Sequence, residues 1–132
     1  MSMKPPLADA DLSAEAAAVF ADIRATRMTD FVNNFWRVLA HDPAALKRTW
    51  ESIRQVMAPG ALDPLTKELI YVAVSMANSC EYCIRSHTAA ASARGMSEAQ
   101  FMELVSIVAM ASETNRMAIA LQVPVDGAFK QV

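Results

Sequence analysis

Apolar side chains recur every three or four residues along most of the chain, for example over residues 12–23 and 31–39. Side chains at this spacing share one face of an α-helix, whereas a half-buried strand alternates apolar and polar residues. No stretch of the sequence sustains that alternation. The pattern therefore predicts an all-α fold of about six or seven helices.

Asp-Pro pairs at 42–43 and 63–64 mark the expected starts of two helices. Aspartate is a favoured N-cap, and proline fits the first helical position because its missing N–H needs no partner there. The first of these helices is expected to end near the Pro-Gly pair at 59–60. Closer to the N-terminus, Asp9–Asp11 and Thr29 are the predicted caps of two earlier helices.

The next helix is predicted to start at Asn78, which lies three residues before Glu81 and so resembles a capping box. Gly95 is its expected C′ residue, which lets the helix run to about Arg94. Only a short bend at 78–79 separates this helix from the preceding one. We therefore expect the two helices to form a central antiparallel hairpin.

Ser97 and Gln100 predict a capped start for the following helix, and a last short helix is expected over residues 115–121, before Pro124. The sequence has no internal repeat and no linker of low complexity. We therefore expect a single domain over residues 1–132.

The composition excludes several classes of protein. The 132-residue chain is 54% hydrophobic and 20% charged, so it is not a disordered chain. Its net charge of −2 argues against a nucleic-acid partner, which would call for a basic patch. The apolar run at 69–76 is far shorter than the ~20 residues of a membrane span, and the N-terminal segment lacks a signal-peptide core. We expect a soluble, cytoplasmic protein without a membrane partner.

The chain has 2 cysteines, Cys80 and Cys83, which form one C-x-x-C motif. In a reducing compartment this spacing favours redox or metal chemistry over a structural disulfide. With Asn78 as the N-cap, Cys80 would lie in the first helical turn, where the helix dipole stabilises a thiolate. His87 follows Cys83 by one turn on the same face, and a histidine beside a cysteine can activate it as a nucleophile.

Glu68 is predicted to lie opposite His87 across the hairpin. Counted from the bend at 78–79, Glu68 lies ten residues before the turn and His87 nine residues after it. At the helical rise per residue, these positions are ~15 and ~14 Å from the bend and therefore level. A carboxylate facing a histidine that faces a thiol would form a proton relay.

The segment from Glu68 through Cys80 and Cys83 to His87 resembles the E-x11-C-x-x-C-x-x-x-H signature of the alkylhydroperoxidase AhpD-like proteins. These proteins belong to the carboxymuconolactone decarboxylase superfamily. The flanking segments SCEYCIRSHTAAA and TNRMAIALQVPVD are also similar to the family's core and C-terminal helix. The resemblance covers roughly residues 30–125.

The resemblance implies a compact helical thiol peroxidase that reduces organic hydroperoxides and assembles as a trimer or hexamer. By position, Cys83 would be the peroxidatic cysteine, and Cys80 would be the resolving cysteine and proton donor. Glu68 and His87 would form the proton relay. Tyr82 stands where some members carry a second relay histidine, and could orient water or peroxide instead. An external dithiol, such as a lipoylated adaptor or a thioredoxin-like protein, would reduce the disulfide.

Other interpretations of these residues remain open. A structural zinc site needs four ligands, and His41 is the only further histidine, so we expect no metal and no cofactor. Inert buried thiols, a muconolactone-type decarboxylase and a disulfide reductase or redox sensor are the remaining alternatives. Arg85 and Arg94 are interpreted as ordinary surface charges. Several apolar helix faces in so small a domain favour a homo-oligomer.

Overall fold

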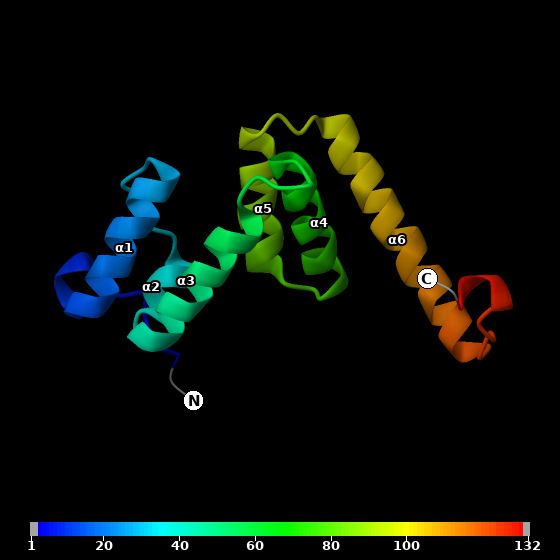
Figure 1. Ribbon diagram of the computed structural model, residues 1–132, viewed down its shortest axis with the longest axis horizontal. Coiled ribbons are helices and arrows are strands. Elements are labelled where there is room, and N and C mark those ends of the chain that lie inside the picture. Colours follow the sequence, from blue (N-terminus) through cyan, green and yellow to red (C-terminus); the bar gives the residue numbers. More distant parts are fainter. Residues whose placement is uncertain (1–2, 131–132) are drawn as a thin grey trace. The chain divides into compact units, whose positions relative to one another are not determined.

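The computed structural model describes residues 3–130, and this part of the chain contains six α-helices, two short 3-10 helices and no β-strand (Figure 1). The predicted all-α class is therefore confirmed. The helices gather into two compact units, of which the first ends at Ala58 and the second begins at Pro59. That residues 1–132 form a single domain stays a prediction. None of the described helices combines the length and the apolar character needed to cross a membrane.

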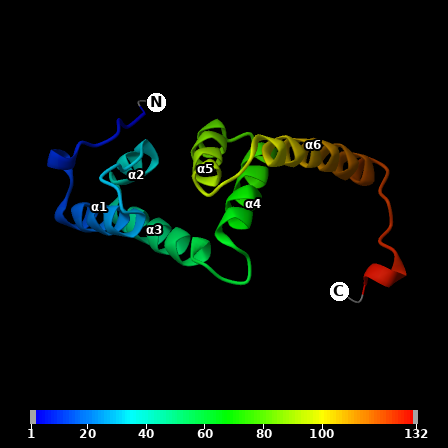
Figure 2. The same ribbon diagram turned by 90° about the horizontal axis from the view of Figure 1, so that it is seen from above.

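The N-terminal unit contains α1 (Ala14–Arg27), α2 (Asn34–Leu39) and α3 (Pro43–Met57), preceded by the short 3-10 helix η1 (Asp9–Asp11) (Figure 2). α3 packs against both α1 and α2. Large apolar side chains hold this unit together, as expected from the helical stripes. The buried members of this core are Ala16, Val19, Phe20, Ile23, Val32, Trp36, Ala40, Leu46 and Trp50.

Both Asp-Pro pairs start helices as predicted. The side chain of Asp42 accepts a hydrogen bond from the N–H of Ala45 at the start of α3. The side chain of Asp63 accepts one from the N–H of Thr66 at the start of α4 (Pro64–Ala77). Each carboxylate thus satisfies a backbone donor that the helix itself leaves unpaired.

The predicted caps of the first two helices are wrong. α1 begins after Ser13, whose hydroxyl accepts a backbone N–H of the first turn, because Asp9–Asp11 forms a 3-10 helix of its own. α2 begins after Asn33 rather than after Thr29. The Thr29 hydroxyl instead accepts the backbone N–H two residues further on, within the loop that precedes α2.

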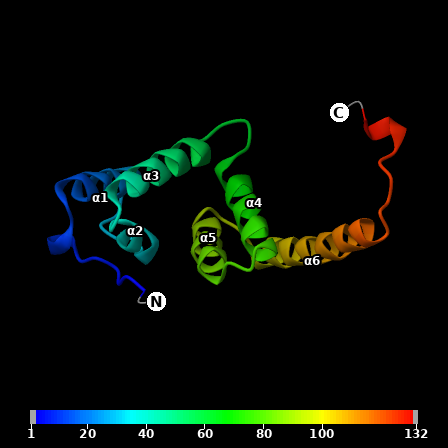
Figure 3. The same cartoon turned by 90° about the horizontal axis from the view of Figure 1, so that it is seen from below.

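The C-terminal unit contains α4, α5 (Glu81–Ala93), α6 (Glu98–Ala120) and the short 3-10 helix η2 (Gly127–Phe129). α4 and α5 run antiparallel beside each other, and they are the two green helices of Figure 1. This confirms the predicted hairpin. α6 packs on α4 and then extends away from it (Figure 3).

The turn between α4 and α5 differs from the prediction. The N–H of Asn78 donates to the carbonyl of Val74, so Asn78 ends α4 instead of starting α5. Ser79 then adopts a left-handed φ of 55°, which redirects the chain. Cys80 is the N-cap of α5, and the predicted capping box of Asn78 and Glu81 is therefore wrong.

α6 is one continuous helix of 23 residues, and the separate helix predicted over residues 115–121 is wrong. Its start is as predicted, because Ser97 and Gln100 form a complete capping box. No proline or glycine interrupts residues 98–120, so the backbone hydrogen bonds continue through Asn115. No residue of α6 is buried. Its large exposed apolar side chains are Met102, Ile107, Met110, Met117 and Ile119.

Candidate active site

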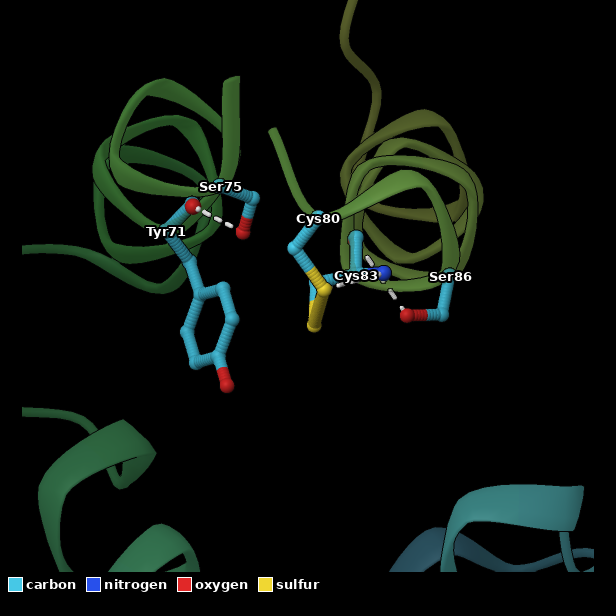
Figure 4. Close-up of a disulfide and its surroundings, with 5 residues drawn as sticks. All are labelled: Tyr71, Ser75, Cys80, Cys83 and Ser86. Atoms are coloured by element: carbon cyan, nitrogen blue, oxygen red, sulfur yellow. Dashed lines mark hydrogen bonds between the residues drawn. A yellow bond between two sulfur atoms is a disulfide. The ribbon is translucent and has the colours of Figure 1, made fainter. Parts of the chain in front are cut away.

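Cys80 and Cys83 form a disulfide at the first turn of α5, on the side that faces α4 (Figure 4). Their Cα atoms are 5.4 Å apart. The backbone N–H of Cys83 donates to Sγ of Cys80 at 3.3 Å, so the N-cap residue of the helix is itself a cysteine. A helix N-terminus stabilises negative charge, and a thiolate formed here on reduction would gain from that stabilisation.

The hairpin brings Glu68 of α4 and His87 of α5 into hydrogen-bond contact. Nδ1 of His87 lies 2.7 Å from Oε2 of Glu68. The Glu68 side chain is only 5% exposed and that of His87 is 20% exposed. When Glu68 is ionised, its carboxylate can only accept, and Nδ1 then carries the hydrogen and leaves Nε2 as the ring nitrogen that can accept one. This contact thus favours the Nδ1–H tautomer, which is the tautomer that a general base acting through Nε2 needs.

Tyr71 of α4 covers one face of the His87 ring. The two ring centroids are 3.5 Å apart and the ring planes meet at 16°, which is a stacked arrangement. Figure 4 shows the Tyr71 side chain on the same side of α4 as the disulfide. The signal for its role was its spacing of three residues from Glu68, which puts both on one face of α4.

Arg94 is not an ordinary surface charge, which corrects the sequence interpretation. Its Nε lies 3.4 Å from Oε1 of Glu68, and its side chain is 45% exposed. Arg94 follows His87 by seven residues, so two helical turns return it to the same face of α5. Gly95, with a φ of 92°, ends the helix directly after Arg94, as predicted.

The remaining candidate residues lie away from this cluster or make other contacts. Tyr82 is 42% exposed, and its position five residues before His87 turns it roughly 140° around α5 from that histidine. Arg85 pairs with Glu81 on the exposed surface of α5, as expected of a surface charge. Nε2 of His41 contacts the carbonyl of Pro5. Within residues 3–130, no group of three or more His, Cys, Asp or Glu side chains could hold a metal ion.

The structure is a helical fold with a C-x-x-C disulfide and an adjacent Glu–His pair. Sequence comparison assigns the chain to a family. Residues 43–126 match the model of the carboxymuconolactone decarboxylase family, and the chain belongs to this family.

Among relatives, the chain is 33% identical over 112 residues to a protein of Anaeromyxobacter sp. (strain K) named alkyl hydroperoxide reductase AhpD. That match covers 79% of this chain and 57% of the relative. A stretch of 54 residues is 43% identical to uncharacterized protein 4 in the cox locus of Paracoccus denitrificans, covering 41% of this chain and 49% of that protein. The chain thus spans about half the length of the curated relatives it matches.

A solved structure resembles the chain over nearly its whole length. It is the crystal structure of the alkylhydroperoxidase AhpD core from Rhodospirillum rubrum, which is 58% identical to this chain. The match has a TM-score of 0.92 and covers 98% of this chain and 97% of the other. The chain is therefore AhpD-like in both sequence and fold.

Proposed function

We propose that this protein is a thiol-dependent peroxidase that reduces organic hydroperoxides through a dithiol/disulfide cycle of Cys80 and Cys83. The observation that carries the proposal is the C-x-x-C disulfide at the start of α5, in the same hairpin as the hydrogen-bonded pair of His87 and Glu68. The names of the AhpD relatives support the same class of reaction.

In the reduced protein, Nε2 of His87 takes the proton of the Cys83 thiol, because the Glu68 carboxylate at Nδ1 stabilises the resulting imidazolium. Cys83 lies one helical turn before His87, the spacing at which side chains on a helix meet. The Cys83 thiolate attacks the terminal oxygen of the hydroperoxide and breaks the O–O bond. The sulfur becomes a sulfenic acid, and the departing alkoxide takes a proton from Cys80 to leave as the alcohol.

The Cys80 thiolate then attacks the sulfur of the Cys83 sulfenic acid. The S–S bond forms, the S–O bond breaks, and the departing hydroxide takes the proton held by His87 and leaves as water. In the disulfide form, Sγ of Cys80 accepts a hydrogen bond from the backbone N–H of Cys83. The same N–H also stabilises the transient Cys80 thiolate. One hydroperoxide and two thiols have become one alcohol, one water and one disulfide.

An external dithiol must return the disulfide to two thiols, and is itself oxidised to a disulfide in the exchange. A lipoylated adaptor or a thioredoxin-like protein has the required chemistry. We also propose that the protein works as a homo-oligomer, a trimer or a hexamer. The exposed apolar side chains of α6 support this, because apolar surface of this extent favours burial against a partner.

The experiment that tests the proposal compares reduced protein before and after one equivalent of cumene hydroperoxide. We expect loss of two hydrogens in the intact mass and loss of both free thiols, together with release of one cumyl alcohol. Cys83→Ser should leave the peroxide unconsumed, whereas Cys80→Ser should stop at a sulfenic acid that dimedone traps.

Turnover by Cys83→Ser would overturn the assignment of Cys83. An unchanged mass with both thiols intact would overturn the peroxidase itself. In that case release of carbon dioxide from a γ-carboxymuconolactone would identify a decarboxylase, and exchange with dithiols alone would identify a disulfide reductase or redox sensor.

A further inference from the structure

Glu68 is a buried carboxylate with one oxygen engaged by His87 of α5 and the other by Arg94, the C-cap of that helix. Oε2 meets Nδ1 of His87 at 2.7 Å, and Oε1 meets Nε of Arg94 at 3.4 Å. Its side chain is 5% exposed, so solvent does little to stabilise its charge. Within residues 3–130, these two side chains supply the ion pairs of Glu68, and Tyr71 stacks on His87 from α4.

The two partners of Glu68 differ in how they hold charge. His87 gains and loses a proton in each cycle of the proposed reaction, so by itself it would leave Glu68 as an unpaired buried anion for part of the cycle. An unpaired buried charge is strongly destabilising. Arg94 keeps its charge at every pH at which a protein is folded.

We propose that Arg94 is a positioning residue whose guanidinium pairs with Glu68 and holds its carboxylate directed at Nδ1 of His87 through the whole thiol cycle. Arg94 acts through Glu68 and does not touch the substrate. The inference rests on the proposed peroxidase function, because only a cycling histidine makes a permanent second cation necessary.

The backbone of α5 fixes Arg94 in place for this role. Its N–H donates to the carbonyls of Ala90 and Ala91, and the left-handed Gly95 ends the helix immediately afterwards. Helical side chains lean towards the N-terminus of their helix, so Arg94 reaches back along α5 towards the level of His87. The last turn of the helix thus supplies a cation for the Glu–His pair, while its first turn supplies the two sulfurs.

The test uses Arg94→Gln and Arg94→Lys, with Arg85→Gln as the matched control. Arg85→Gln removes the same charge from an exposed site on the same helix. In the first measurement, ¹⁵N NMR of the ring reports which nitrogen of His87 carries the hydrogen. We expect the Nδ1–H tautomer in the wild type, in Arg94→Lys and in Arg85→Gln, and a mixture of tautomers in Arg94→Gln.

The second measurement is the rate of Cys83 alkylation against pH in a Cys80→Ser background, with peroxide consumption by the two-cysteine protein alongside. In Arg94→Gln we expect the half-maximal alkylation rate at a higher pH and a roughly tenfold slower reaction with cumene hydroperoxide, with Arg94→Lys in between. Arg85→Gln should match the wild type. A wild-type tautomer and pH profile in Arg94→Gln would overturn the proposal.

Two further outcomes are also decisive. If Arg94 acts through Glu68, then Arg94→Gln adds no further loss in a Glu68→Gln background, and an additive loss would contradict that route. If no variant consumes peroxide, the peroxidase proposal fails, but the NMR tautomer still decides whether Arg94 orients the Glu–His pair. If Arg94→Gln does not fold, Arg94→Lys carries the comparison through its alkylation profile, and a wild-type pH profile and peroxide rate in Arg94→Lys would overturn the proposal.

Discussion

The two units of this chain bury different kinds of side chain. In the N-terminal unit, the buried core is apolar and includes large rings such as Phe20 and Trp36. In the described part of the C-terminal unit, the buried residues are the apolar Val72 and Ala91 and the polar Glu68 and Ser75. The first unit gains its stability from packed apolar surface, whereas the second places a charged group where packing alone would exclude it. Substitutions in the two units should therefore separate stability from chemistry.

The largest effect on stability is expected from Phe20→Ala, which empties a fully buried site in the N-terminal unit. Replacing a buried phenylalanine by alanine costs about 3–5 kcal/mol through lost burial and the cavity that remains. Both tryptophans of the chain, Trp36 and Trp50, belong to the same core, so their fluorescence reports the unfolding of this unit. We expect a lower urea midpoint by fluorescence. An unchanged midpoint would mean that the site collapses around the smaller side chain.

Substitution of Glu68 should have the opposite effect to Phe20→Ala, because we expect it to lower activity and leave stability unchanged. Glu68→Gln keeps the shape of the side chain but removes the charge that stabilises a protonated His87. Loss of a general acid–base group lowers rates by about 10²–10⁴, so peroxide consumption should fall at least a hundredfold while the urea midpoint measured by hydrogen exchange of α4 peptides stays unchanged. Glu81→Gln, an exposed acid on α5, is the matched control and should keep full activity. A rate within threefold of wild type would remove Glu68 from the relay.

A smaller effect is expected at Tyr71, which separates stacking from hydroxyl chemistry. Aromatic pairs contribute about 0.5–1.5 kcal/mol beyond buried area, which corresponds to at most about tenfold in rate if the stack orients His87 only in the reactive geometry. We expect Tyr71→Leu to react with peroxide up to about tenfold more slowly and Tyr71→Phe to stay within twofold of wild type. Equal losses in both variants would point to the hydroxyl instead.

The sequence predicts features that depend on residues close together in the chain better than it predicts contacts between helices. The helical stripes, the Asp-Pro starts at 42–43 and 63–64 and the Ser97 cap are local patterns, and the structure confirms them. The hairpin count brought Glu68 level with His87, because two straight helices joined by a tight turn leave little freedom of register.

The errors arose where two local signals compete or where the partner lies across the hairpin. Asn78 has the residue type of a helix start, but its N–H already closes the last turn of α4. Arg94 and Tyr71 each share a face with a site residue of their own helix. Which of several surface residues on that face turns inward depends on how α4 and α5 pack, and periodicity alone does not contain that information.

The smallest expected effect is on the stability of the two units at low pH. Each unit has one exposed carboxylate with a lowered pKa, and the two are stabilised by different hydrogen-bond donors. Hydrogen bonds from Arg37 and then Arg24 hold the pKa of Asp9 below its ordinary value in the N-terminal unit. Hydrogen bonds from the side chain and then the backbone of Thr66 lower the pKa of Asp63 at the start of α4. A carboxyl whose folded pKa is lowered stabilises the fold above its unfolded pKa of about 4, and that stabilisation is lost as the pH falls through the folded value.

Salt should separate the two carboxylates, because the partners of Asp9 are charged and the donors of Thr66 are neutral. Added salt screens exposed charge pairs, so we expect it to weaken the acid sensitivity due to Asp9 but not that due to Asp63. The measurement is the urea midpoint between pH 5 and pH 2, by tryptophan fluorescence for the first unit and by hydrogen exchange of α4 peptides for the second. Asp9→Asn and Asp63→Asn should each flatten the profile of their own unit only, since asparagine does not titrate, and at position 63 it can still cap α4. An equal salt response at both sites would mean that charge, rather than the neutral cap, lowers the pKa of Asp63.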